Sequence, residues 1–277
     1  MGTWLGWIAA LVAAGAVLAG VVVLAVWITM GRGPEIAAIT PRDPAGLPAD
    51  QVALGAALAA VGDCGVCHTK PDGAPFAGGV GLETPFGTVF STNITPDPET
   101  GIGQWSEAAF VRSMTQGLDR AGNHLFPVFP YDHFAKVTEG DLAAIYAYLM
   151  TRPDVAEPPP ADAWGFPFNQ RPLLAWWKWL YLDPSPWAAD PALDDEQNRG
   201  AYLVSGLGHC GACHTPRTML GGLDRNPPSP GPRLKTGTCP PLVRLPLSRP
   251  DGPWMPMPIT CSTAGTMPMV WPTDPWA

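Results

Sequence analysis

One five-residue pattern, Cys-x-x-Cys-His, occurs twice in the chain, at residues 64–68 and again at 210–214. Two thiols at positions i and i+3 lie on one side of a helical turn, where both can form thioethers to the vinyl groups of one porphyrin. The next residue, a histidine, then lies below the iron as its proximal ligand. This is the attachment pattern of c-type haem. The sequence therefore predicts two haem c groups, bound through Cys64, Cys67, Cys210 and Cys213, with His68 and His214 as axial ligands.

Paired cysteines also occur in zinc sites and in thiol–disulfide oxidoreductases. A structural zinc site needs four ligands in a closed tetrahedron, typically from cysteine pairs at short separation. These two pairs lie far apart, and each carries an adjacent histidine. A redox Cys-x-x-Cys is typical of a βαβ setting, and no such pattern surrounds either motif. Haem attachment is therefore the favoured interpretation.

Length and charge restrict the remaining possibilities. A chain of 277 residues can hold two domains of ordinary size. The net charge of −8 argues against nucleic acid as a partner. Proline (35) and glycine (31) are in excess, largely in an internal linker and in the C-terminal tail. Cys239 and Cys261 lie in that tail and do not indicate a disulfide framework.

Residues 4–30 form an unbroken apolar run. As a helix this run would be about 40 Å long, which exceeds a hydrocarbon core of about 30 Å. The apolar region of a cleaved signal peptide is usually about 7–15 residues long and follows a basic segment, whereas this run is longer and lacks one. We therefore expect residues 1–31 to be an uncleaved transmembrane anchor. Because haem c is attached on the exported side of bacterial membranes, the residues after Arg32 are expected on the periplasmic side of the inner membrane.

Helix and loop signals between residues 49 and 151 follow the order of a small cytochrome c domain. The tether of residues 32–48 leads to a helix that runs into the first haem motif, and a long stretch of turn signals follows. A helix over 106–116, a second loop and a closing helix with a capping box at Thr138 complete the pattern. Gly55 in the entry helix is small enough to let another helix approach closely.

Residues 152–196 are rich in proline and aromatic residues and predict a semi-rigid linker. The alternative is a surface that docks a partner or lies at a membrane, because Trp and Tyr favour interfaces. Gly200-Ala201-x-Leu203 then repeats Gly55-Ala56-x-Leu58, so residues 197–225 are predicted to begin a second domain. The expected fold class is all-α: a transmembrane helix plus two class I-like cytochrome c domains, the second incomplete.

Seven stretches between about residues 50 and 224 carry a resemblance to a known family. They are 62–69, 75–79, 84–88, 91–97, 101–103, 166–173 and 198–217. These stretches resemble the membrane-associated multihaem cytochrome c subunits of bacterial alcohol, aldehyde and gluconate dehydrogenase complexes. The resemblance implies electron transfer from a dehydrogenase catalytic subunit, of the pyrroloquinoline quinone, flavin or molybdenum type, to membrane quinone or a terminal oxidase. Many members carry three haems, whereas this chain has two motifs.

The sequence departs from this family at the sixth iron ligand. The family often places a ligating Met within Pro-x-Met-Pro-Tyr, but here Phe129 stands in its place and cannot bind iron. Two histidines flank that loop, and we expect His133 to be the sixth ligand, with His124 as the runner-up. Met114 and Met150 are further candidates, and the alternative for a lone loop histidine is a solvated or hydrogen-bonded side chain. An iron between two histidines would have a lower potential than a His–Met iron.

The tail of residues 226–277 departs from the family altogether. It has no helical periodicity, and its composition is typical of a disordered segment. The reading frame can be shifted so that the last base of each codon is read together with the first two bases of the next codon. In that frame, the codons possible for residues 254–258 and 273–277 allow a sequence like that of the family, including Gly-Pro-Met. We therefore hypothesise that the reading frame shifts near residues 225–227. The second haem motif would then lack most of its distal wall.

The leading function is that of an electron carrier rather than an enzyme, since no nucleophile–base constellation, phosphate loop or paired-carboxylate motif stands out. A dihaem cytochrome c peroxidase is the enzymatic alternative, because Phe129 in place of Met would leave one iron position open. A truncated product without function is the other alternative.

Overall fold

The computed structural model describes residues 2–41, 43–224, 233–234 and 237–238. The predicted disordered tail, its two cysteines and the proposed change of reading frame therefore lie outside the described residues, apart from two short strands. The chain divides into two compact units, Met1–His209 and Cys210–Ala277.

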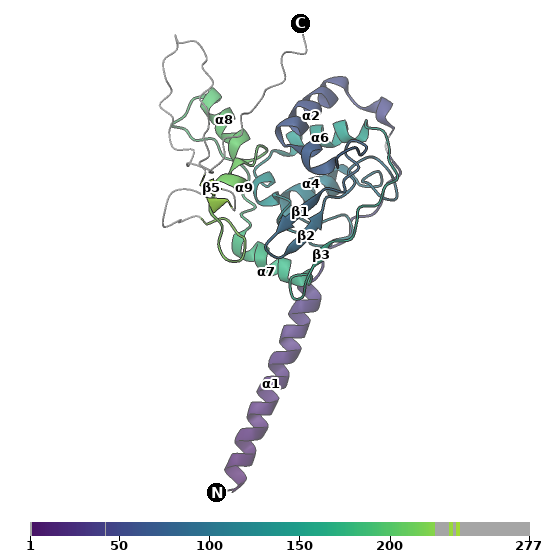
Figure 1. The fold of residues 1–277 in the computed structure, drawn as a ribbon. Coiled ribbons are helices and arrows are strands. Elements are labelled where there is room, and N and C mark those ends of the chain that lie inside the picture. The colour runs from purple at the N-terminus through teal and green to yellow at the C-terminus, as the bar shows by residue number, and fades with distance from the viewer. Residues whose placement is uncertain (1, 42, 225–232, 235–236, 239–277) are drawn as a thin grey trace. The chain divides into compact units, whose positions relative to one another are not determined.

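The first unit is mostly helical (Figure 1). Its elements are α1 (Gly2–Met30), the 3-10 turn η1 (Pro44–Gly46), α2 (Ala49–Val61), α3 (Cys64–His68), β1 (Gly81–Thr84), β2 (Gly87–Phe90), α4 (Glu107–Gln116), α5 (Tyr131–Phe134), α6 (Glu139–Met150), β3 (Ala163–Trp164), α7 (Pro172–Tyr181) and α8 (Asp195–Ser205). The second unit contains α9 (Cys210–His214) and the antiparallel pair β4 (Arg233–Leu234) and β5 (Gly237–Thr238).

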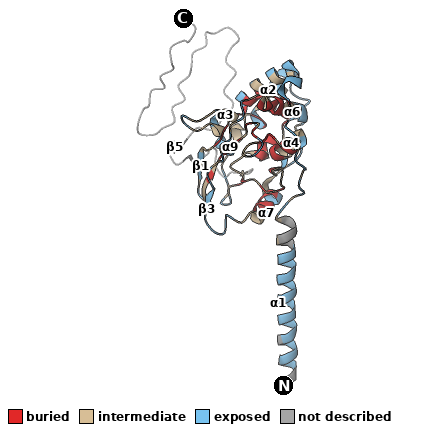
Figure 2. Ribbon diagram, turned by 90° about the vertical axis from the view of Figure 1, so that its right-hand side faces the viewer, coloured by how far each residue is buried: buried red, intermediate tan, exposed pale blue. Residues whose placement is uncertain are grey.

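Helix α1 is exposed along most of its length (Figure 2). Its segment Gly6–Ala25 has a mean hydropathy of 2.7, so the helix is long and apolar enough to cross a membrane. Trp7 and Trp27 stand near its two ends, roughly 30 Å apart at the rise of an α-helix. Tryptophans at this spacing are typical of the two interfaces of a bilayer.

The core of the first unit lies where α2, α4, α5 and α6 pack together (Figure 2). Leu142, Ile145 and Tyr146 of α6 are fully buried there. A Cβ atom on Gly55 would lie 1.9 Å from the carbonyl oxygen of Ala144, so the backbones of α2 and α6 are in contact. The prediction that Gly55 lets another helix approach closely is thus confirmed.

The expectation of an all-α fold is corrected by a small antiparallel sheet in the order β1-β2-β3. β1 and β2 form a hairpin in which Gly81 pairs with Phe90 and Thr84 with Gly87. Gly87 has φ 136°, and a Cβ there would lie 2.4 Å from the Ala163 carbonyl oxygen of β3. The turn signals of this stretch were visible in the sequence, but strands of four residues are too short for a periodicity to identify.

Neither β3 nor α7 was expected from the sequence, which predicted a semi-rigid linker over residues 152–196. α7 begins with Pro172 in its first turn, where the missing N–H costs no helical hydrogen bond. α8 begins with a capping box between Asp194 and Gln197. The segment before the second motif therefore carries ordered elements of its own.

Candidate haem-binding site

Helix α3 is a single turn that follows α2 directly. Asp63 at its N-cap takes the left-handed conformation, with φ 51°, and its carbonyl oxygen accepts hydrogen bonds from the N–H groups of Val66 and Cys67. This tight reversal brings Cys64 onto the hydrophobic core. Burial raises the pKa of Cys64 to about 12, whereas a redox-active Cys-x-x-Cys depends on a lowered thiol pKa. The first motif is therefore poorly suited to thiol–disulfide exchange.

The imidazole of His68 is oriented by a backbone carbonyl. Its Nδ1–H donates to the carbonyl oxygen of Thr92 across 2.6 Å. Burial lowers the pKa of His68, which favours the neutral ring. A neutral imidazole with its proton on Nδ1 carries its lone pair on Nε2, and this is the form that a histidine metal ligand needs.

A buried polar cluster fixes the loop that carries this carbonyl. Asn93 and Thr95 are 1% and 0% exposed. Asn93 Oδ1 accepts from the N–H and the hydroxyl of Thr95 at 2.9 and 2.7 Å. Asn93 Nδ2 donates to Thr100 Oγ1 at 2.9 Å and to the Val155 carbonyl at 2.7 Å. The stretch 91–97, one of those that resemble the family, thus joins the Thr92 loop to the chain after α6.

His133, the predicted sixth ligand, lies on the short helix α5 and is 7% exposed. Its Nδ1–H donates to the carbonyl oxygen of Ser205 across 3.0 Å. Its Nε2 is buried and has no hydrogen-bond partner. An unpaired buried acceptor costs about 1–3 kcal/mol, and a bond to iron would satisfy it. His133 therefore has the buried, unshared nitrogen lone pair that an iron ligand needs.

His124, the runner-up, is held differently. It is also buried, but Lys178 of α7 lies 3.0 Å from its Nδ1 and 2.6 Å from the carbonyl oxygen of Gly117. Burial lowers the pKa of Lys178 to about 7. While Lys178 is charged, its ammonium donates to His124 Nδ1, so a neutral His124 carries its own proton on Nε2 and offers iron no lone pair there. The geometry favours His133.

The other candidate ligands are packed as core residues. Met114 and Met150 are 5% and 2% exposed and belong to the hydrophobic cluster around α6. Phe129, which stands where the family often has methionine, packs against that cluster, with its ring centroid 5.3 Å from that of Phe134. Their contacts give none of these three residues a distinct role as an iron ligand.

The second motif lies on α9 in the second unit. Cys210 is half-buried, whereas Cys213 and His214 are exposed. Arg217 donates to the carbonyl oxygens of Ala212 and Gly221 at 3.0 and 2.7 Å and so holds the turn after the motif. The four cysteines of the two motifs form no disulfide. Within the described residues, no group of three or more His, Cys, Asp or Glu side chains gathers as a metal site.

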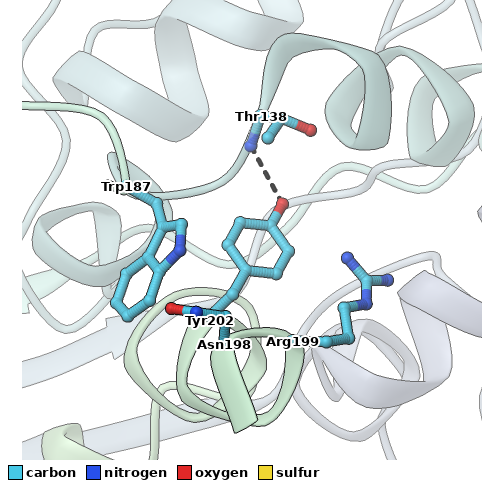
Figure 3. Close-up of a pocket in the computed structure, with 5 residues that line it drawn as sticks. All are labelled: Thr138, Trp187, Asn198, Arg199 and Tyr202. Carbon is cyan, nitrogen blue, oxygen red and sulfur yellow. Dashed lines mark hydrogen bonds between the residues drawn. The ribbon is translucent and has the colours of Figure 1, made fainter. Parts of the chain in front are cut away.

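A pocket of about 270 Å³ lies where α8 meets the segment before α6 (Figure 3). It is lined by Thr138, Trp187, Asn198, Arg199 and Tyr202. The Tyr202 hydroxyl accepts from the Thr138 N–H at 3.0 Å and donates to Asp141 at 2.7 Å. These bonds fasten α8 to the start of α6, so the pocket is a by-product of that junction.

Thr92, Ser205 and Lys178 were missed by sequence reasoning. Thr92 and Ser205 act through backbone carbonyls, which any residue type supplies. Lys178 is the only charged residue of α7. A single lysine within an aromatic run was the one sequence feature that could have pointed to a functional contact there.

No protein-family model matches the chain. Curated relatives do match it. Over 187 residues it is 51% identical to a nicotinate dehydrogenase subunit of Pseudomonas putida, covering 68% of this chain and 16% of that protein. Over 170 residues it is 44% identical to the cytochrome c subunit of alcohol dehydrogenase (quinone) of Gluconacetobacter polyoxogenes, covering 60% and 36%. A diheme cytochrome c-type protein of Cereibacter sphaeroides is 42% identical over 170 residues, covering 60% and 57%.

The chain is homologous to cytochrome c subunits of dehydrogenase complexes. It spans less than two thirds of the length of each of these relatives. Similar subunits occur with gluconate and fructose dehydrogenases. The homology agrees with the resemblance found in the sequence.

Proposed function

We propose that the chain is a dihaem c-type cytochrome that passes electrons from the catalytic subunit of a dehydrogenase to the respiratory chain. The observation that carries the proposal is the pair of histidines in the first unit. His68 has its Nδ1 tied to Thr92, and His133 has a buried, unpartnered Nε2. Two Cys-x-x-Cys-His motifs and a diheme relative support the count of two haems.

Bound haem would supply a one-electron change between Fe(III) and Fe(II). Cys64 and Cys67 would hold the group at α3, and His68 and His133 would be the residues that bind its iron. The cluster around Asn93 keeps the Thr92 carbonyl in place and so fixes the His68 ring. Two nitrogen ligands favour Fe(III) more than a nitrogen and a thioether do, so a haem held by these two histidines would have a low potential for a cytochrome c.

The electron donor in this proposal is a dehydrogenase catalytic subunit of the pyrroloquinoline quinone, flavin or molybdenum type, and the acceptor is membrane quinone or a terminal oxidase. The relatives' names, which include a quinone-dependent alcohol dehydrogenase, support such partners. Helix α1 would anchor the chain in the bacterial inner membrane, with the haem domains on the periplasmic side. Its length and hydropathy support the anchor.

The proposal is tested by counting covalent haem in the full chain, expressed in a host that matures c-type cytochromes. We expect two haems per wild-type chain, by haem stain on denaturing gels and by intact mass. The variants Cys64→Ser/Cys67→Ser and Cys210→Ser/Cys213→Ser should each retain one. Absence of covalent haem from the wild-type chain would refute the proposal, and a single haem would refute its dihaem form.

A further inference from the structure

Helix α7 exposes its apolar side chains and buries its lysine. Trp176, Trp179 and Leu180 are 45%, 74% and 54% exposed, whereas Lys178 is 9% exposed. Positions i, i+3 and i+4 share one face of a helix, so the three exposed residues form one surface, here called the aromatic face. A helix at a water-exposed surface would present its lysine and bury its tryptophans.

The orientation of α7 is fixed by specific contacts on its inner side. Lys178 donates to the carbonyl oxygen of Gly117 and lies 5.1 Å from the centroid of the Tyr131 ring. Trp177 packs edge-on against the same ring, with centroids 6.0 Å apart. A rotation that hid the aromatic face would break these contacts and take the Lys178 ammonium away from the Gly117 carbonyl oxygen.

Helix α7, which carries the aromatic face, lies beside the candidate membrane span. Residues of α7 come within 8 Å of residues of α1, Cα to Cα, and both views place α7 where α1 joins the domain (Figures 1 and 2). Phe166, in the turn before α7, is 82% exposed. Tryptophan is enriched at the boundary between headgroups and acyl chains, where an amphipathic helix can lie in the membrane plane.

We infer that the aromatic face of α7 lies in the interfacial layer of the membrane that α1 crosses, with its tryptophans among the lipid headgroups and the first acyl carbons. This inference rests on the anchor role proposed for α1. It assigns the Trp-rich segment to lipid rather than to a protein partner. Anchored at α1 and seated on α7, the first haem domain would be held at a fixed height above the bilayer.

The test uses the full, haem-loaded chain without partner subunits, in vesicles of phosphatidylethanolamine and phosphatidylglycerol. A trace of phosphatidylcholine carries a diazirine at the headgroup end of one acyl chain. After illumination, labelled residues are mapped by mass spectrometry. We expect label on α1 and on Trp176 and Trp179, and none on Leu193 and Val204 near and on α8, which are 38% and 51% exposed.

Label confined to α1 would overturn the inference. So would label on α7 equal to that on Leu193 and Val204. The variant Trp176→Ser/Trp179→Ser/Leu180→Ser should lose the α7 label, whereas the matched variant Leu193→Ser/Val204→Ser should keep it. Haem content and dithionite reduction, measured on the same vesicles, report separately on the proposed function. If the α7 label disappears when a dehydrogenase subunit is added to the same vesicles, the occupant of the aromatic face is a protein and the inference is wrong.

Discussion

The Nδ1–H of His133 donates to the carbonyl oxygen of Ser205 across 3.0 Å, although the two residues are 72 positions apart in the chain. Ser205 is the last residue of α8, the helix that repeats the entry helix of the first domain. The second copy of the entry helix therefore orients a histidine of the first domain. Because the bond fixes the Nδ1–H tautomer, the lone pair of His133 lies on its buried Nε2.

The first prediction concerns this ring. His133→Ala should change the absorption spectrum of one of the two haems and shift its reduction potential, because one of its axial ligands is lost. His124→Ala is the matched control, since that histidine is equally buried but is engaged by Lys178. Spectra and potentiometric titrations of both variants check this. Unchanged haem spectra in His133→Ala would reject the ligand role.

The second prediction concerns the cluster that orients His68. Asn93→Ala removes five hydrogen bonds of a fully buried side chain, so the free energy of unfolding should fall by about 2–3 kcal/mol. The half-buried Asn198 bonds to Asp190 and Leu193, and Asn198→Ala should cost less. Urea denaturation followed by haem absorbance measures both. Equal costs for the two variants would contradict a special role for the Asn93 cluster.

The sequence predicted those features that are encoded by residues close together in the chain. The haem motifs and the close approach at Gly55 were found because local spacing or residue size encodes them. The hairpin β1–β2 was missed because its strands are four residues long. Helix α7 was missed because the prolines and tryptophans of residues 152–196 indicated a linker, although Pro172 is well placed at a helix start.

The contacts that orient the candidate ligands could not be predicted, for a different reason. Thr92 and Ser205 orient histidines through backbone carbonyls, and no residue type marks a carbonyl that will be used in this way. The choice between His133 and His124 depends on Lys178, which lies 54 residues from His124. Such contacts arise only once the tertiary fold is formed.

The third prediction is a pH dependence. Lys136 donates to Asp183 Oδ2 at 2.8 Å and to the Ser185 carbonyl at 2.7 Å. The hydrogen bond from Lys136 is the main cause that holds the pKa of Asp183 well below its ordinary value. Because the folded-state pKa lies below the unfolded one, the stabilisation is full above the ordinary aspartate pKa of about 4 and is lost as the pH falls further.

Asp183→Asn should therefore lower the free energy of unfolding by about 0.5–1 kcal/mol at pH 7, a small value because the side chain is partly exposed. The difference from wild type should shrink below about pH 4. Urea titrations at several pH values provide the measurement. In a Lys136→Met background the same substitution should have less effect, and a full effect there would show that Lys136 is not the cause.

The last prediction compares the two copies of the duplicated entry helix. Gly55 and Gly200 occupy equivalent places in the repeated Gly-Ala-x-Leu pattern. A Cβ on Gly55 would meet the Ala144 carbonyl at 1.9 Å, whereas nothing lies within 4 Å of one on Gly200. Gly55→Ala should push α2 from α6 and cost at least about 1–3 kcal/mol. Gly200→Ala should be neutral or stabilising by up to about 1 kcal/mol, because alanine favours the helix.

Thermal or urea unfolding of the two variants, with wild type alongside, measures the contrast. If Gly200→Ala proved as costly as Gly55→Ala, the second entry helix would have to be packed against another element as closely as the first. A mild effect of Gly55→Ala would instead show that α2 and α6 can separate without loss. The contrast matters for the haem, because α2 leads directly into α3 and a displaced α2 carries Cys64 and His68 away from the Thr92 carbonyl.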